Sequence, residues 1–432
     1  MFGYYLDLAR RNLKRNLGLT VLMVLAIGFG VGASMTTLTL LHILSADPIP
    51  QKSDKLHYVQ LDPRPMRGFT LGQEPNEQSS RADAEALVRA HRADRQALMT
   101  AGSAPIEPQR PGIEPFLTDG RWTSNEFFPM FDVPFSAGGP WTQADDDAHA
   151  RVCVISRALA EKLFGNEHAV GFTVRVSGAE MRVVGVLGDW RPTPHFYDLN
   201  VDQYGKGEQI LLPWTTSRDL ELGHDGNMNC WDQAPDATKL DAPCQWIQFW
   251  VELDSDAKLA DYREFLVHYS EDQLKAGRYQ RPPNVQLRNV MEWLDYNKVV
   301  PNDARLQTWL SLGFLIVCLV NTVGLLLTKF LRRSSEIGVR RALGASKRTI
   351  FFQLLVEAGS IGVIGGLVGL LLALTGLWLV RLSAGDYGSI AHIDLPMLAA
   401  TFVVSIVASL LAGLLPAWRG CQVAPAIQLK SL

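Results

Sequence analysis

The sequence EIGVRRALGA at residues 336–345 and the following Ser346-Lys347-Arg348 form a basic block between two long apolar runs. Before this block the chain contains one apolar run, a long polar region and a second apolar run. After it come two further apolar runs. The block is therefore the point from which the other parts of the chain can be assigned.

The four apolar runs contain no Asp, Glu, Lys or Arg, and they cover residues 17–46, 306–328, 358–380 and 395–418. About 20 apolar helical residues cross the ~30 Å hydrocarbon core of a bilayer, and each run is long enough. We predict transmembrane helices over 17–46, 306–330, 354–380 and 395–418. The first run exceeds the apolar region of a signal peptide, which has about 7 to 15 residues, so we expect it to remain as an anchor.

Basic residues flank these runs on one side of the membrane. They are Arg10, Arg11, Lys14 and Arg15 before the first run, and Lys329, Arg332, Arg333, Arg340, Arg341, Lys347 and Arg348 between the second and third. Short flanks rich in Lys and Arg stay in the cytoplasm. We therefore expect a membrane protein with both termini inside. Residues 1–16 form an amphipathic helix on the inner face, 331–353 a cytoplasmic segment, 381–394 a short outer loop and 419–432 a cytoplasmic tail.

The region from 47 to 305 lies outside the membrane in this arrangement. It contains 39 acidic and 27 basic side chains, which sum to −12, whereas the whole chain has a formal charge of −3. An acidic external region without a basic stripe argues against nucleic acid as a partner. Lipid remains the expected partner of the apolar runs.

Alternating and amphipathic patterns in residues 47–305 predict an α+β domain. Strands are expected at 56–61, 152–155 and 246–253, a hairpin at 172–186, and helices at 82–98 and 259–274. We expect strands from the two ends of the region to share one sheet. A smaller unit at about 121–244 is inserted between them.

Cys230 and Cys244 are both external and lie in a polar stretch, so we predict a disulfide that closes a short loop. A metal site with His224 is the alternative, but the spacing matches no standard ligand pattern. Asp145-Asp146-Asp147 are expected in a solvated loop rather than in a cation site.

No stretch of the sequence matches a nucleotide-binding P-loop, a G-x-S-x-G elbow or an H-E-x-x-H helix. We therefore assign no catalytic, cofactor-binding or metal-binding residue to this chain. No charged residue lies in the middle of an apolar run, which argues against an ion-conducting pore or a secondary transporter.

Glycines recur in two of the apolar runs at spacings that let helix backbones approach closely. They are Gly28, Gly32, Gly362, Gly365, Gly366 and Gly369. We predict a helix-packing role for all six, and a contact with a second copy of the chain is slightly favoured for Gly28 and Gly32.

Several motifs combine into a resemblance to a known family. The basic block, GVIGGLVG at 362–369, GLLPAWR at 413–419 and PAIQL at 425–429 resemble the FtsX-like permease domain of type VII ABC transporters. FFPMF at 127–131, VISRALAEKLFG at 154–165 and VVGV at 183–186 are similar to the MacB-type periplasmic core. MacB itself carries a fused ATPase domain, and this sequence starts at its membrane portion, so the resemblance implies a separate ATPase subunit.

The resemblance further implies a location in a bacterial inner membrane and a mechanism of mechanotransmission. ATP and magnesium would bind to a cytoplasmic ATPase partner, and a permease dimer, identical or mixed, would rearrange its external domains to export a peptide, toxin or drug-like cargo. A periplasmic adaptor and an outer-membrane exit protein are possible further partners. The residues expected to couple to the ATPase are Glu336, Ile337, Gly338, Arg340, Arg341, Leu343, Gly344 and Ala345.

Three alternatives stay open at this point. The chain could be an FtsX-like signalling protein that regulates a periplasmic hydrolase, or a Lol-like permease that releases lipoproteins. The basic block could also be a surface helix held by anionic lipid, where each Lys or Arg contributes ~1 kcal/mol.

Overall fold

The computed structural model describes residues 2–165, 168–201, 203–205, 207–382 and 395–422. They form two compact units, one from residues 47–299 and one from the rest. The predicted outer loop at 381–394 lies almost entirely outside the described residues, as do most of the tail at 419–432 and the PAIQL motif.

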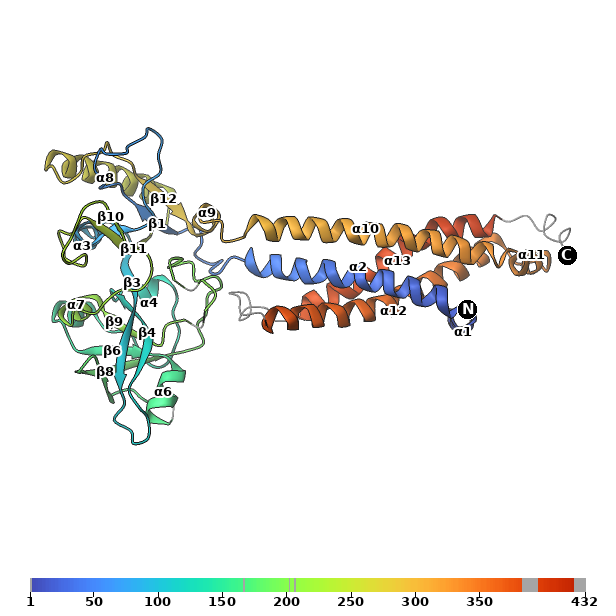
Figure 1. Cartoon of the computed structure of the whole chain (residues 1–432), viewed down its shortest axis with the longest axis horizontal. Helices are drawn as coiled ribbons and strands as arrows, with labels where there is room; N and C mark the ends of the chain where they lie inside the picture. The colour runs from blue at the N-terminus through green and yellow to red at the C-terminus, as the bar shows by residue number, and fades with distance from the viewer. Residues whose placement is uncertain (1, 166–167, 202, 206, 383–394, 423–432) are drawn as a thin grey trace. The chain divides into compact units, whose positions relative to one another are not determined.

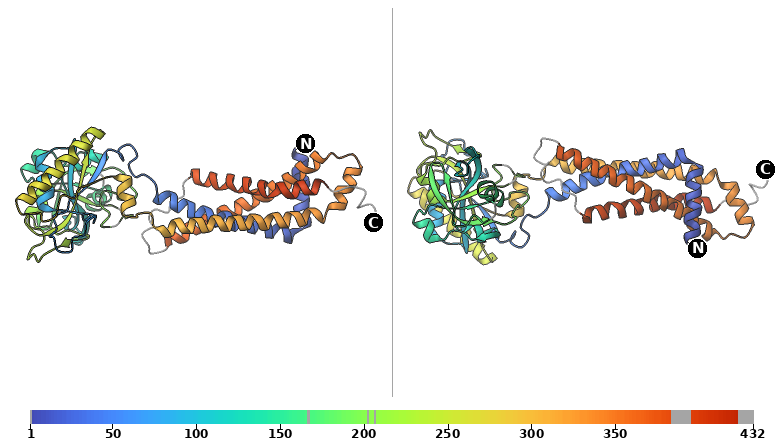
Figure 2. Two further views of the ribbon diagram at one scale, coloured as in Figure 1. Left: turned by 90° about the horizontal axis from the view of Figure 1, so that it is seen from above. Right: turned by 90° about the horizontal axis from the view of Figure 1, so that it is seen from below.

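The membrane unit is built from long helices that pack side by side (Figures 1 and 2). Its elements are α1 Phe2–Arg15, α2 Leu17–Leu44, α10 Asn302–Leu331, α11 Ser334–Ala342, α12 Lys347–Leu382 and α13 Leu395–Cys421. Among the described residues four helices, α2, α10, α12 and α13, are long and apolar enough to cross a membrane. The predicted fold, four membrane helices with a large α+β domain between the first two, is confirmed.

The external unit contains a sheet whose main path runs β12-β1-β11-β3-β4-β9-β6-β8-β5. These strands are β1 Leu56–Gln60, β3 Arg95–Glu107, β4 Phe116–Thr123, β5 Phe135–Gly138, β6 Val152–Ile155, β8 Ala179–Leu187, β9 Ile210–Pro213, β11 Cys244–Glu252 and β12 Gln286–Asn289. Off this path lie β2 Ser79–Ser80, β7 Thr173–Val176 and β10 Asn229–Cys230. The helices are α3 Arg81–Ala90, α4 Phe127–Met130, α5 Gln143–Asp147, α6 Arg157–Phe164, α7 Trp214–Asp219, α8 Asp256–Lys275 and α9 Val290–Tyr296.

Strands from the two ends of the external region pair directly, as the sequence predicted. β1 pairs antiparallel with both β12 and β11. The predicted hairpin at 172–186 is also present, because β7 and β8 are joined by Ser177 and Gly178, both with positive φ. The boundary that we expected near residue 121 for an inserted unit falls inside β4.

The helix predicted over 82–98 is wrong in its second half. α3 ends at Ala90, where His91 adopts a left-handed conformation, and Arg95 starts the long strand β3. The Gln96 side chain donates hydrogen bonds to the Leu87 and Val88 carbonyls at 3.0 and 2.6 Å, which satisfies the end of α3. Leu98 therefore belongs to a buried central strand that pairs with Phe249 of β11, rather than to an amphipathic helix.

A buried charge group lies in the external unit. The Arg121 side chain on β4 is 3% exposed and donates hydrogen bonds to Asp198, at 2.6 Å, and to Glu208. Burial acts to lower the pKa of Arg121, but the two carboxylates outweigh burial and raise it. The guanidinium also lies 5.0 Å from the centre of the Tyr197 ring. This group, which we call the Arg121 group, joins β4 to the chain that precedes β9.

Asp146 corrects the expectation of a solvated acidic loop. It lies in α5, is 5% exposed, and accepts hydrogen bonds from the Trp141 indole at 3.2 Å and from the Asn125 backbone N–H at 3.1 Å. Burial raises the pKa of Asp146 to about 6, although these hydrogen bonds oppose the rise.

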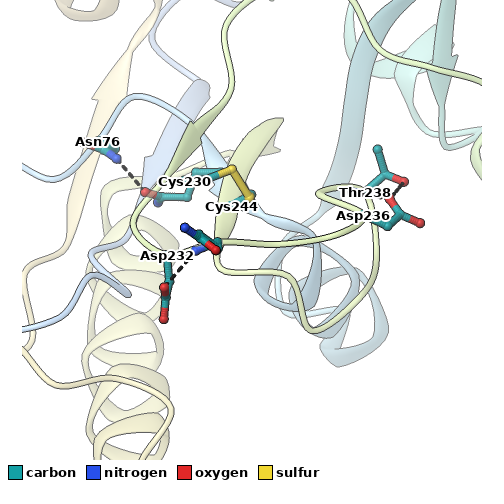
Figure 3. The surroundings of a disulfide bond; sticks show 8 residues. Asn76, Cys230, Asp232, Asp236, Thr238 and Cys244 are labelled. Atoms are coloured by element: carbon teal, nitrogen blue, oxygen red, sulfur yellow. Dashed lines mark hydrogen bonds between the residues drawn. A yellow bond between two sulfur atoms is a disulfide. The ribbon is translucent and has the colours of Figure 1, made fainter.

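The structure joins Cys230 of β10 to Cys244 of β11 in a disulfide, at a sequence separation of 14 (Figure 3). His224, the third residue of the alternative metal site, stacks on Trp246 with ring centres 5.0 Å apart. Among the described residues, no three His, Cys, Asp or Glu side chains lie close enough together to hold a metal ion.

Candidate functional site

The basic block forms the short helix α11 and the turn that follows it. α11 contains five of the eight residues predicted to couple to an ATPase, namely Glu336, Ile337, Gly338, Arg340 and Arg341. Leu343, Gly344 and Ala345 form the turn into α12. Gly344 has φ +100°, a conformation that other residues rarely adopt, and the Ala345 N–H donates to the Arg340 carbonyl at 3.1 Å.

α11 has one face in the membrane unit and one face exposed. Ile337 is 4% exposed and packs in the apolar core of the helix bundle, and Gly338 is buried as well. Val339 and Leu343 are 45% and 83% exposed. These two exposed apolar side chains lie beside the basic residues of α11.

Glu336 organises the basic residues around α11. Its carboxylate lies 2.8 Å from Arg340, 3.3 Å from Arg333 and 3.7 Å from Arg15 of α1. Burial acts to raise the pKa of Glu336, but the three guanidinium groups outweigh burial and lower it. Arg340 also donates to the Gln353 side chain of α12 at 3.1 Å, so α11 is held to the next helix by a side-chain bridge.

A second carboxylate, Glu357 of α12, lies inside the membrane unit. Lys329 Nζ is 2.9 Å from Glu357 Oε1, without the alignment of a hydrogen bond, and both side chains are fully buried. Arg333 donates to Glu357 Oε2 at 3.0 Å, and Asn12 of α1 donates to the same oxygen at 3.2 Å. Lys329 in turn donates to the Thr20 hydroxyl of α2 at 3.4 Å. We call these five residues the Glu357 centre.

The Glu357 centre was not predicted from the sequence. Lys329 and Arg333 served only to orient the chain, and Glu357 and Asn12 were given no role. A signal was present, because Lys329 directly follows one charge-free run and Glu357 directly precedes the next. A buried charge needs a partner of opposite sign, so an acidic residue at the end of one apolar run and a basic residue at the end of another indicate an ion pair between the two helices.

The predicted packing glycines lie between helices of the same chain. A Cβ on Gly28 would come within 2.8 Å of Val368 Cγ1, and one on Gly32 within 3.1 Å of the Gly369 carbonyl oxygen. Similar close approaches place Gly365 and Gly369 against α2, and Gly362 and Gly366 against Ser409 and Ser405 of α13. The idea that Gly28 and Gly32 face a second copy is wrong, because α12 covers that face.

The fold and this site define a class: a helical membrane protein with a large external α+β domain and a short basic helix between its second and third spans. Two family matches then identify the family. Residues 20–266 match the MacB-like periplasmic core domain, and residues 309–425 match the FtsX-like permease C-terminal domain. The chain therefore belongs to the MacB-type, FtsX-like permeases of ABC transporters and is an inner-membrane protein.

Named relatives are similar over different parts of the chain. The macrolide export ATP-binding/permease protein MacB of Wolinella succinogenes is 24% identical over 99% of this chain and 60% of its own length. The pyoverdine export ATP-binding/permease protein PvdT of Pseudomonas aeruginosa is 25% identical over 71% of this chain and 42% of its own. This chain thus spans 60% or less of the length of these relatives.

One solved structure, the periplasmic region of MacB from Actinobacillus actinomycetemcomitans, aligns over 59% of this chain and 96% of its own. Its TM-score is 0.36 and its identity to this chain 15%.

Proposed function

We propose that this chain is the permease part of a MacB-type exporter, in which ATP hydrolysis by a cytoplasmic ATPase rearranges the external domain. In this proposal α11 is the docking helix for the ATPase, both termini are cytoplasmic, and ATP and magnesium bind to the partner. Two permease copies, identical or related, work side by side. The cargo is a peptide, toxin or drug-like molecule handled outside the membrane.

The observation that carries the proposal is the two-sided character of α11. Ile337 anchors one face in the bundle, whereas Leu343 is exposed and the Arg340 bridge ties the helix to α12. A partner that pushes on Leu343 would therefore move α12 rather than a loose loop. The exporter names of the relatives support the direction of transport, and the acidic external domain favours a small-molecule or peptide cargo over nucleic acid.

Cross-linking can test the docking role directly. The chain is co-expressed with its ATPase and purified, and Leu343→Cys is treated with a thiol-reactive cross-linker. We expect a covalent adduct between permease and ATPase. Leu310→Cys is the matched control, because Leu310 is also exposed, at 64%, but lies within the apolar span of α10. Failure of any ATPase to co-purify, or equal cross-linking from both positions, would contradict the proposal.

A further inference from the structure

Glu357 of α12 and the side chains around it come from several elements of the membrane unit. The Glu357 centre includes Asn12 from α1, Thr20 from α2, Lys329 from α10, and Arg333 from the turn before α11. Figures 1 and 2 show α11 and α1 at the same end of this unit. A single buried carboxylate of α12 is thus connected to the basic helix and to the amphipathic helix at once.

We propose that Glu357 is the positioning residue that holds α11 and α1 to the helix bundle, and that a displacement of α11 reaches α1 through the Glu357 centre. The inference rests on the proposed docking role of α11 and adds α1 as a second helix that responds when α11 is displaced. Glu357 contacts no cargo or nucleotide in this account. It acts through the position of the two helices.

The two ion pairs of the Glu357 centre differ in how easily they can open. The Lys329–Glu357 pair should stay closed, whereas the Arg333–Glu357 pair can separate. Lys329 and Glu357 are both fully buried, and pulling them apart would leave the Lys329 cation unpaired in the apolar interior, at a cost of several kcal/mol, even though Glu357 would keep Arg333. Arg333 behaves differently, because it also lies 3.3 Å from Glu336, which is partly exposed. When Arg333 leaves Glu357, Lys329 still compensates Glu357 and Glu336 still compensates Arg333. The contact between Arg333 and Glu357 can therefore open without leaving an uncompensated charge.

The link to α1 passes mainly through Asn12. Two weaker contacts also join α1 to this region. Thr20 donates to the Leu13 carbonyl of α1 at 3.3 Å, and Arg15 forms an ion pair with Glu336 at 3.7 Å, with the Arg15 side chain 75% exposed. Exposed ion pairs contribute little, about 0 to 1 kcal/mol. Asn12 is 8% exposed and donates to a buried carboxylate, which makes a stronger bond. Glu357 is consequently the residue that contacts both Asn12 of α1 and Arg333 in the turn before α11.

Hydrogen–deuterium exchange on the full chain in lipid nanodiscs tests the inference without any ATPase. We expect Arg333→Gln to raise amide exchange in α11 by about tenfold or more, because it removes the charge-assisted hydrogen bond to Glu357 together with two to Glu336. Exchange in α1 should stay at the wild-type rate. Asn12→Ala should do the reverse and raise exchange in α1 only, and Glu357→Gln should raise it in both helices.

Neither Arg333→Gln nor Asn12→Ala leaves a buried charge unpaired, so these variants keep the test valid if Glu357→Gln does not insert. Arg333→Lys, which retains a cation, should exchange more slowly in α11 than Arg333→Gln. Arg11→Gln is the matched control, since Arg11 is 77% exposed and pairs only with Asp7 in a surface contact. Wild-type exchange of α11 in Arg333→Gln, or a Glu357→Gln effect confined to one helix, would overturn the inference.

The cross-linking test and the exchange test can fail independently. Loss of the Leu343→Cys adduct with an intact exchange pattern would remove the docking role and leave Glu357 as a positioning residue. An intact Leu343→Cys adduct, with wild-type exchange in Arg333→Gln and Glu357→Gln, would keep the docking role of α11 and remove the positioning role of Glu357.

Discussion

The Arg121 group and the Glu357 centre each contain a buried charge that is paired with side chains of opposite sign. In the external unit, Arg121 of β4 is held by Asp198 and Glu208, which both lie in the segment that precedes β9. In the membrane unit, Glu357 is held by Lys329 and Arg333, which belong to separate segments. The partners of Arg121 come from one loop and stabilise the external unit, whereas the partners of Glu357 come from α1, α10 and the turn before α11, and we infer that they couple the movements of these elements.

The largest effect is expected from Arg121→Met. It leaves Asp198 and Glu208 buried without their cation, which costs about 3 to 5 kcal/mol of the free energy of unfolding. Denaturant unfolding of the full chain, followed by near-ultraviolet circular dichroism, measures the loss. Arg110→Met, at an exposed arginine, serves as the control and should change stability little. Faster exchange in α11 of Arg121→Met would contradict the contrast between the two regions.

A comparable effect, confined to the external unit, is expected from pH. The pKa of Asp146 is about 6 in the folded chain and close to 3.8 when unfolded, so the folded state binds the extra proton between these values. The contribution of this proton to the free energy of unfolding is fully present below about pH 4, falls as pH rises, and is lost above about pH 6. The change is ~3 kcal/mol.

Unfolding free energies measured between pH 4 and pH 7 check this, with Asp146→Asn as the comparison. The variant should lack this part of the decline. A decline of the same size in Asp146→Asn would show that Asp146 is not its source.

A smaller effect is expected from Gly32→Ala in the membrane unit. The added Cβ would lie 2.8 Å from Leu372 Cβ and 3.1 Å from the Gly369 carbonyl oxygen, so α2 and α12 must move apart. Overpacking of this kind costs about 1 to 3 kcal/mol. Gly313→Ala is the matched control within α10, since its Cβ would have no neighbour within 4 Å. Thermal unfolding in nanodiscs should give a lower melting temperature for Gly32→Ala than for Gly313→Ala. Equal melting temperatures would contradict close packing of α2 on α12.

The sequence predicted the membrane helices well because length and absence of charge are local properties. It failed at residues 91–98, where the decisive contacts of Leu98 are with Phe249 of β11, far along the chain. The Glu357 centre was missed for the same reason. Asn12 and Glu357 are 345 positions apart, and no periodic pattern links them. The basic block itself was visible, but its buried and exposed faces were not.

The central claim is that force enters at α11 and reaches the external domain. The most direct measurement places spin labels on the external domains of the transporter in liposomes, together with its ATPase, and compares their distances with and without ATP and vanadate. We expect a nucleotide-dependent change in the wild type and none in Arg340→Glu/Arg341→Glu, which should still insert into the membrane. The same distance change in the double variant would contradict the claim.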